Sequence, residues 1–370
     1  MASETIEDSF PEVRSNFEEY RSDLRDYLIR RGMPHRTAED VELNLPFDKM
    51  ADPNVPYQGR FLLLHGLNDS AYVWQDFASS LVTLGFDVRT ILFKGHGSTP
   101  KDMLRVSSDH WLKESRRQLD LWWDNNSPMY IGGFSMGAVI ASLLALEKPK
   151  LAGLLLVSPA FHSKLNKYLR WSGVSKKFKP WVFGGMIWED NPIKYNSIPV
   201  NSGYQYYRLT EKKSWRRNKI SVPTLVIASL DDSVVDHNYS RKLFKRRFVH
   251  PNNRLVLYGN EEIVQFSEQE INRPSRFPQL RVLNQSHLGL MYKPNNPLFG
   301  RNGTVLVCNG NEYPIFMACM RATGHWYGAQ HAVSPDGVPV ARTTYNADWA
   351  FVEEQIQSTF MSTRPSNSSE

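Results

Sequence analysis

The chain has 370 residues, of which 41% are hydrophobic and 22% charged, and its formal net charge is +6. These values are typical of one large globular domain with insertions, and they exclude a disordered chain or a fibre. No apolar run reaches the roughly 18 residues of a membrane-spanning helix, and the first residues lack the pattern of an export signal. We therefore expect a soluble, cytoplasmic protein by default; an exported mature form would require a signal removed beforehand.

Residues 1–45 predict an N-terminal helical arm. Ser9 and Glu12 match a capping box at its start, and Gly32 predicts its end. Between them an apolar stripe recurs every three or four positions, at Phe10, Val13, Phe17, Tyr20, Leu24 and Leu28. Such a stripe must dock on another part of the molecule.

Short apolar runs then alternate with helical stretches, which predicts a mostly parallel sheet flanked by helices. The expected strands are 61–64, 87–93, 129–132, 151–157 and 224–228, followed by strand-like runs at 254–258 and 280–283. The expected helices are 74–84, 109–123 and 136–147, with a last one whose Trp349, Val352, Ile356 and Phe360 share a face. The fold class is therefore α/β.

Three segments interrupt this alternation. Residues 161–222 are rich in aromatic side chains and carry 13 Lys and Arg against 3 acidic residues, so we interpret them as an inserted cap. The remaining core divides into 46–160 and 223–370, with further insertions at about 260–279 and 293–345.

The two cysteines, Cys308 and Cys319, lie in the last insertion, beside a hairpin-like stretch at 305–317. Their spacing and surroundings do not match a zinc site, so no metal is expected. Two unpaired buried thiols are the favoured interpretation; a short-loop disulfide is the alternative in an exported protein.

Residues 133–137, Gly-Phe-Ser-Met-Gly, fit the pattern G-x-S-x-G between a predicted strand and a predicted helix. In that context the serine occupies a tight turn, and small neighbours let the chain fold back. Ser135 is therefore the candidate nucleophile. A serine needs a histidine as base and an acid that orients the histidine, in the chain order serine, acid, histidine.

That order is met by Asp232, after the strand 224–228, and by His287, after the run 280–283. Asp231 is the competing acid. Other histidines, including His65 and His96, are expected to be structural.

These residues resemble the α/β-hydrolase family, in particular its bacterial carboxylesterase and monoacylglycerol-lipase-like branch. His65-Gly66 resembles the family's oxyanion loop, and Gly95-His96-Gly97 resembles a further segment of that branch. The likeness covers roughly 60–160, 223–240 and the piece around His287. It implies an α/β-hydrolase fold, Asp232 as the acid, and an oxyanion hole formed by the main-chain N–H groups of Leu67 and Met136. The chain departs from the family pattern at Ala138, where many relatives carry glycine, and in the long gap before His287.

The resemblance and the three residues predict hydrolysis of carboxylic esters through an acyl-enzyme, without metal or cofactor. Candidate substrate-binding residues in the insert are Trp171, Trp181, Trp188 and Tyr204; they equally suit a small core of the cap itself. The expected partner is a small ester or acyl lipid, with transient contact to a lipid surface. No motif indicates nucleic-acid binding, and the oligomeric state is left open.

Three rival functions use the same residues or the same fold. A thioesterase or an acyltransferase would share all three side chains, and related folds cleave carbon–carbon bonds. A ligand-binding homologue would keep the fold without the reaction.

The acidic arm, with 11 acidic and 6 basic residues, carries charge opposite to that of the basic insert. We hypothesise that the arm packs on or beside the cap; docking on the core away from the cap is the alternative.

Overall fold

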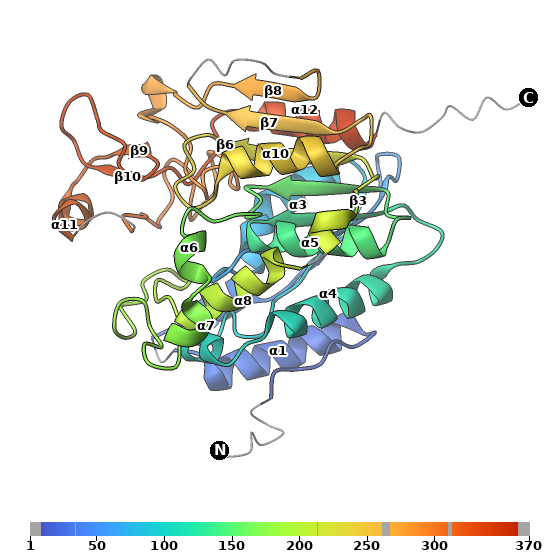
Figure 1. Cartoon of the computed structure of the whole chain (residues 1–370), viewed down its shortest axis with the longest axis horizontal. Helices are drawn as coiled ribbons and strands as arrows, with labels where there is room; N and C mark the ends of the chain where they lie inside the picture. The colour runs from blue at the N-terminus through green and yellow to red at the C-terminus, as the bar shows by residue number, and fades with distance from the viewer. Residues whose placement is uncertain (1–8, 34, 213, 261–266, 310–312, 362–370) are drawn as a thin grey trace, which may run out of the picture.

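The computed structural model describes residues 9–33, 35–212, 214–260, 267–309 and 313–361, which fold around an eight-stranded sheet (Figure 1). The strand order is β1-β3-β2-β4-β5-β6-β7-β8, and every neighbouring pair is parallel except β1 with β3. The strands are β1 (Asp48–Lys49), β2 (Gly59–Leu64), β3 (Phe86–Thr90), β4 (Met129–Phe134), β5 (Gly153–Val157), β6 (Thr224–Ser229), β7 (Arg254–Tyr258) and β8 (Glu270–Arg273).

Side chains alternate between the two faces of the strands, so each face has its own core. In β2, Leu62 and Leu64 join the core that contains residues of α4 (Ser108–Trp122), α5 (Met136–Glu147) and α10 (His237–Arg247). Phe61 and Leu63 join the opposite core, with α3 (Gln75–Thr83) and α12 (Trp349–Phe360). The sheet thus lies between two layers of helices, as the sequence predicted (Figure 1).

Most predicted elements are confirmed within a few residues, and β7, α5 and α12 have the expected bounds. The run at 280–283 is not a strand. Residues Pro278–Leu280 form a 3-10 turn, η4, and Arg281 follows with φ of 56°, which a strand does not allow. The last strand of the sheet is instead β8, inside the segment 260–279 that was expected to be an insertion.

The arm helix α1 (Phe17–Arg31) begins later than predicted, because Asn16 rather than Ser9 is its N-cap. The Asn16 side chain accepts from the main-chain N–H groups of Glu18 and Glu19. Phe10 and Val13, which were expected on the helix, are buried in the extended segment before it. The helix ends before Gly32, as predicted, and a second helix, α2 (Ala38–Asn44), follows.

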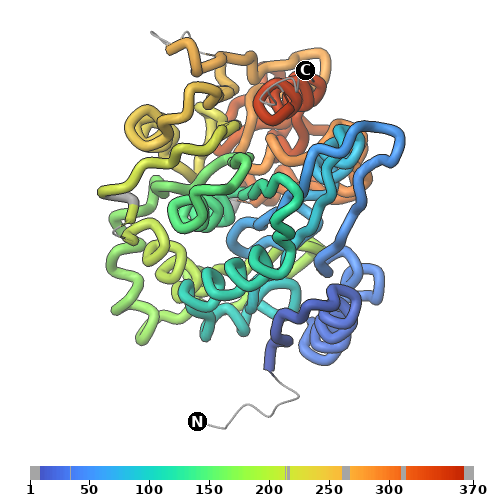
Figure 2. Tube along the Cα trace, turned by 90° about the vertical axis from the view of Figure 1, so that its right-hand side faces the viewer, coloured from blue at the N-terminus to red at the C-terminus, as the bar shows by residue number. Residues whose placement is uncertain are grey.

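The arm docks on the core and on the insert. On α4, the Tyr20 hydroxyl donates to Glu114 Oε1 at 3.4 Å, and Arg117 Nε donates to the Val13 carbonyl at 2.7 Å. The chain after α1 reaches the insert, where the His35 ring stacks on Trp188 with 5.5 Å between centroids. The N-terminal helix and α12 lie at opposite ends of the molecule in both views (Figure 2).

The insert between β5 and β6 contains α6 (Asn166–Leu169), α7 (Ser172–Ser175), α8 (Val200–Thr210) and α9 (Ser214–Arg217). Helix α8 fastens it to the core. Its Tyr206 hydroxyl donates to the Ala160 carbonyl at 2.7 Å, and Gln205 accepts from the Ser108 amide at the start of α4. Two short 3-10 helices, η2 (Ala71–Trp74) and η3 (Pro100–Leu104), belong to the core before the insert.

The excursion after residue 293 contains α11 (Tyr313–Arg321) and a parallel pair of strands, β9 (Trp326–Gly328) and β10 (Val340–Arg342), and packs against the core through Val305, Val307 and Tyr327. The hairpin expected at 305–317 is therefore wrong, since its second half is helical; residues 310–312 lie outside the described part. The expectation of two unpaired thiols is also wrong, because Cys308 and Cys319 form a disulfide. No described helix has the length and apolar character needed to cross a membrane.

Candidate active site

Ser135 stands at the turn between β4 and α5, with φ of 54° and ψ of −114°. This left-handed backbone is costly for a residue with a side chain, and it persists only where the surroundings enforce it. Here the surroundings enforce it, because main-chain atoms lie so close to both glycines of the motif that neither position has room for a side chain. A Cβ atom on Gly137 would lie 2.1 Å from the Leu64 carbonyl oxygen, and one on Gly133 2.5 Å from the Ala138 nitrogen.

The structure brings Ser135, Asp232 and His287 together from three separate loops. Ser135 Oγ lies 2.9 Å from His287 Nε2, and His287 Nδ1 lies 2.6 Å from Asp232 Oδ2. These two contacts leave one consistent protonation pattern for a neutral imidazole, with the proton on Nδ1 and the lone pair of Nε2 directed at the serine hydroxyl.

Asp232 follows β6 and is fully buried. Its second oxygen, Oδ1, accepts from the amides of Val234 and Val235 at 2.8 and 3.1 Å, so the carboxylate is held on both sides. The neighbouring Asp231 faces elsewhere and accepts from Ser275 Oγ at 3.0 Å. Of the two acids that the sequence offered, only Asp232 contacts the histidine.

His287 lies in the loop that follows η4, and both its main chain and its ring are held. Its carbonyl accepts from Ser158 Oγ at 2.9 Å, beyond the end of β5. Its ring packs beside Phe134 with 5.2 Å between centroids. These contacts limit the rotation of the imidazole between the serine and the aspartate.

The main-chain N–H groups of Leu67 and Met136 flank the serine from two sides. Leu67 belongs to the loop after β2, and a Cβ on the neighbouring Gly66 would lie 3.2 Å from Ser135 Cβ. Met136 is the first residue of α5, where helix geometry leaves the N–H groups without partners. Among the described residues, neither amide donates a hydrogen bond.

Two buried histidines near this loop have structural contacts. His65 hydrogen-bonds the Gly66 carbonyl through Nδ1 and accepts from the Phe93 amide through Nε2. Burial holds its pKa well below the usual value, and burial lowers the pKa of His96 to about 4. Both rings are therefore neutral at pH 7 and act as packing elements beneath the oxyanion loop.

An ion pair that no sequence pattern indicates lies beside the site. Asp69, two residues after Leu67, is buried, and its Oδ2 lies 3.3 Å from Nζ of Lys194 in the insert. Burial raises the pKa of Asp69, and the ammonium group of Lys194 and the ring of His287 oppose this rise. Asp69 lies in the loop after β2, close to Leu67 in the sequence. Its partner Lys194 lies 125 positions away, and no sequence pattern links the two residues.

The four aromatic candidates of the insert lie in different environments. Trp171 and Trp188 are 67% and 74% exposed. Tyr204 is half-buried, with Nζ of Lys176 4.5 Å from its ring centroid, and Trp181 is half-buried in a bridge to Pro199. No contact found among the described residues joins these four side chains to the triad.

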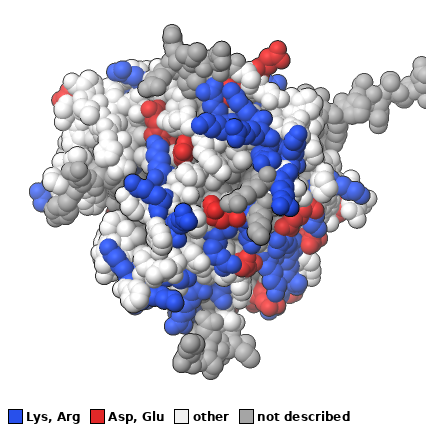
Figure 3. Space-filling model, in the orientation of Figure 1, with Lys and Arg blue, Asp and Glu red and all other residues white. Residues whose placement is uncertain are grey.

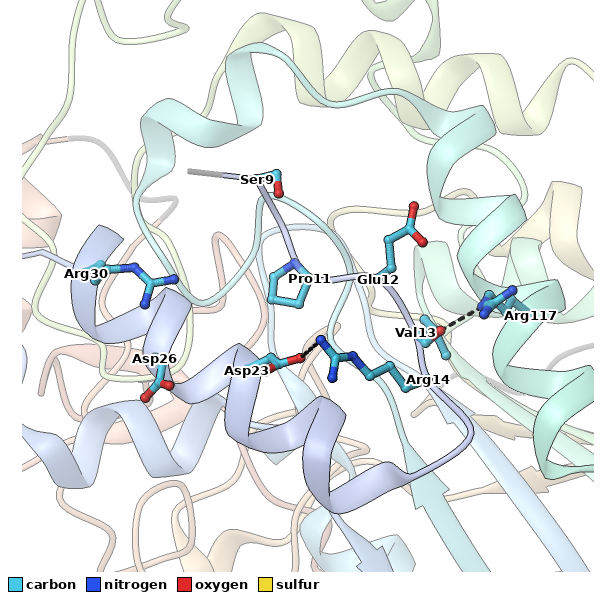
Figure 4. A pocket seen from close by; sticks show the side chains of 9 residues that line it. All are labelled: Ser9, Pro11, Glu12, Val13, Arg14, Asp23, Asp26, Arg30 and Arg117. Atoms are coloured by element: carbon cyan, nitrogen blue, oxygen red, sulfur yellow. Dashed lines mark hydrogen bonds and ion pairs between the residues drawn. The ribbon is translucent and has the colours of Figure 1, made fainter. Parts of the chain in front are cut away.

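A hollow of about 470 Å³ lies between the extended start of the arm and α1 (Figure 4). Its charged lining is partly paired within itself: Arg14 Nη2 lies 2.8 Å from Asp23 Oδ2, and Arg117 bonds the Val13 carbonyl. None of the three triad residues lines it. We therefore assign it to the docking of the arm rather than to the reaction.

One group of possible metal ligands is found in the described part of the chain, Cys308, Cys319 and His325. Its two sulfur atoms are bonded to each other, which leaves the histidine as its one available ligand. The residues present do not fit a metal centre.

The parallel sheet and the strand–serine–helix turn define an α/β-hydrolase. Residues 56–260 match the family model Hydrolase_4, described as serine aminopeptidase, S33, and the chain belongs to this family.

A thermostable monoacylglycerol lipase from Bacillus sp. (strain H-257) is 24% identical over 185 residues, which cover 47% of this chain and 70% of the relative. Two solved structures are similar at lower identity. One, reported for the metagenome-derived lipolytic enzymes LipS and LipT, has a TM-score of 0.49 and 20% identity, covering 58% of this chain and 87% of the other. The other, a soluble variant of monoglyceride lipase from Saccharomyces cerevisiae, has a TM-score of 0.47 and 17% identity, covering 58% and 81%.

Proposed function

We propose that the protein is a serine hydrolase that cleaves carboxylic esters through an acyl-enzyme intermediate. The observation that carries the proposal is the unbroken line from Ser135 Oγ through the His287 ring to Asp232, with contacts of 2.9 and 2.6 Å. A serine hydroxyl becomes an effective nucleophile only when such a base accepts its proton.

In the first half of the reaction, His287 Nε2 takes the proton of Ser135 as Oγ attacks the ester carbonyl carbon. The carbonyl oxygen becomes negative and accepts from the amides of Leu67 and Met136; loss of one such donor typically lowers turnover by about 10² to 10³. Asp232 stabilises the imidazolium that forms.

His287 then gives the proton to the departing alcohol, which leaves an acyl group on Ser135. In the second half, water enters and His287 removes its proton, so that the water oxygen attacks the acyl carbon. The acid departs as the proton returns to Ser135 Oγ, which restores the starting state.

The family description names aminopeptidases, whereas the curated relative is a lipase. An aminopeptidase has to bind the free ammonium group of its substrate, and this requires an unpaired carboxylate near the serine. The buried carboxylate beside this site, Asp69, is already paired with Lys194. This pairing favours an uncharged ester, and the similarity to a monoacylglycerol lipase supports a lipid ester as the substrate. Thioester hydrolysis and transfer of the acyl group to an alcohol use the same three residues and are the alternatives.

A fluorophosphonate probe tests the nucleophile directly, because it labels only an activated serine. We expect labelling of the wild-type protein and none of Ser135→Ala. The matched control is Ser142→Ala on the same helix, whose hydroxyl bonds the Ala138 carbonyl, and it should be labelled like the wild type. An unlabelled wild-type protein that still binds acyl lipids would make the chain a binding homologue instead.

Turnover of p-nitrophenyl esters of increasing chain length, compared with monoacylglycerols, acyl thioesters and aminoacyl p-nitroanilides, tests the substrate class. We expect ester turnover to exceed anilide turnover. Faster cleavage of the anilides would overturn the ester assignment and favour a peptidase.

A further inference from the structure

The surface of the insert around α6, α7 and the loop that follows is unusually apolar. Of the twenty large apolar side chains that are exposed among the described residues, ten fall within residues 165–188. They are Leu165, Tyr168, Trp171, Val174, Phe178, Val182, Phe183, Met186, Ile187 and Trp188. We call this group the exposed apolar surface. Contiguous exposure on this scale is rare in a protein that remains in water, and it marks an interaction site.

The same segment is strongly basic. Residues 161–188 contain no acidic residue, and their basic residues are Lys164, Lys167, Arg170, Lys176, Lys177 and Lys179. Figure 3 shows Lys and Arg side chains spaced among uncharged ones in the lower left, over the region of α6 and α7. An apolar surface interleaved with positive charge is complementary to a layer that is apolar inside and negative at its boundary.

The backbone beneath this surface is held in place, so the exposed side chains are presented by a defined structure. The Ile187 amide donates to Ser197 Oγ at 2.9 Å, and Trp181 bridges to Pro199. The buried Glu189 accepts from the Ser197 amide at 2.7 Å, which fixes the end of the loop. Trp188 is supported on one face by the His35 ring and is otherwise open to solvent.

Both ends of the segment touch the candidate active site. Before it, Lys164 Nζ donates to the main-chain carbonyl of Asp232. After it, Lys194 pairs with Asp69 beside the oxyanion loop. The exposed apolar surface therefore belongs to the stretch of chain that leaves the site and returns to it.

We propose that the exposed apolar surface docks the protein on the face of an anionic lipid bilayer. Trp and Tyr side chains insert at the level of the headgroups, and the Lys and Arg side chains between them contact the lipid phosphates. This goes beyond ester hydrolysis, because the binding requires no reaction at Ser135. It also gives the transient contact with a lipid surface that the sequence led us to expect a definite place, the exposed side chains of residues 165–188.

The test is co-sedimentation with vesicles of phosphatidylcholine containing about 30% phosphatidylglycerol, compared with vesicles of phosphatidylcholine alone. The full chain carrying Ser135→Ala is used, so that binding is measured without turnover. We expect binding to the anionic vesicles that weakens at least about tenfold without the anionic lipid or when salt rises from about 0.05 to 0.5 M.

The variant Phe178→Ser with Phe183→Ser should weaken binding by at least about tenfold, because 85% and 61% of these residues' surfaces are exposed. The control is Val333→Ser, which removes an equally exposed apolar side chain from the late excursion and should bind like the parent. Lys177→Gln with Lys179→Gln provides a second variant, with no apolar change, that should weaken binding to anionic vesicles only.

Two results would overturn the proposal. One is the absence of binding to anionic vesicles, or equal binding by the parent and the Phe178/Phe183 variant. The other is a parent protein that is a dimer in light scattering, does not bind vesicles, and becomes a monomer in that variant; the occupant would then be a second copy of the chain. The same double variant is also made with Ser135 intact. It should hydrolyse a short water-soluble ester at the wild-type rate, which separates a loss of membrane binding from a loss of catalysis.

Discussion

The carboxyl group of Glu114 provides a test of how the arm is docked. It is buried on α4 and accepts from the Tyr20 hydroxyl of α1 and from the Lys94 amide. Burial raises its pKa from 4.5 to about 8. The folded protein therefore keeps Glu114 protonated at a pH where the unfolded chain has already lost that proton.

The sign of the effect follows from proton binding. Between about pH 4.5 and 8 the folded state binds more protons than the unfolded state, so the free energy of unfolding decreases as pH rises. Below that window both states are protonated, and above it both are ionised, so the contribution is constant. From pH 6 to 8 the two pKa values correspond to a loss of about 2 kcal/mol.

Glu114→Gln keeps the shape of the side chain and removes its ionisation. As pH rises from 6 to 8, the free energy of unfolding of the variant should increase by about 2 kcal/mol relative to that of the wild type. Urea unfolding at three pH values measures this change. Tyr20→Phe removes the hydroxyl that donates to Glu114 but leaves the carboxyl group ionisable and buried, so the free energy of unfolding should still decrease as pH rises. A difference between wild type and Glu114→Gln that is the same at pH 6 and pH 8 would refute the reasoning.

Three further predictions concern the site, the disulfide and the arm. Asp232→Asn should lower ester turnover by about 10³ to 10⁴, and Asp231→Asn should leave most of it, because only Asp232 bonds the imidazole; equal losses would contradict the assignment. Replacing Cys308 and Cys319 by serine opens an 11-residue loop and should destabilise its surroundings by about 3 kcal/mol, seen as faster tryptic cleavage near α11; unchanged cleavage would argue against it. Deleting residues 1–45 removes the stacking on Trp188 and should alter the ratio of long-chain to short-chain ester turnover; a soluble protein with the wild-type ratio would show that the arm has no part in the entrance.

The central strands could be predicted because they are buried on both faces and read as uninterrupted apolar runs, as in β5. The edge strand β8 could not be predicted, because Ile271 is its single apolar residue and the other three are Glu270, Asn272 and Arg273. The run at 280–283 was predicted to be a strand because three of its four residues are apolar. Val282 is buried because it bridges to Phe277 and to Tyr327, contacts that belong to the tertiary structure and leave no local pattern.

Ser135 and Asp232 could be placed together because each follows a strand of the parallel sheet, and the ends of such strands meet at one edge. His287 was placed by its order in the chain, although the run before it, 280–283, is not a strand. The ion pair of Asp69 with Lys194 could not be predicted, because the two residues lie in distant segments of the chain that only the fold brings together. The aromatic content of the insert was evident, but which side each ring faces depends on the packing of α7 against α8.

The distance along the chain between partners has a consequence for how the protein is made. Tyr20 is synthesised 94 residues before its partner Glu114, and Ser135 is synthesised 152 residues before His287. The ring of Phe360 joins the aromatic cluster of Phe61 and Tyr130 long after those two residues have been synthesised. Because domains fold as units while the chain emerges, we expect nascent chains that stop before α12 to expose the arm's apolar stripe and to need chaperone protection. Ser135 thus meets the ring of His287 only after the 152 residues that separate them in the chain have been translated.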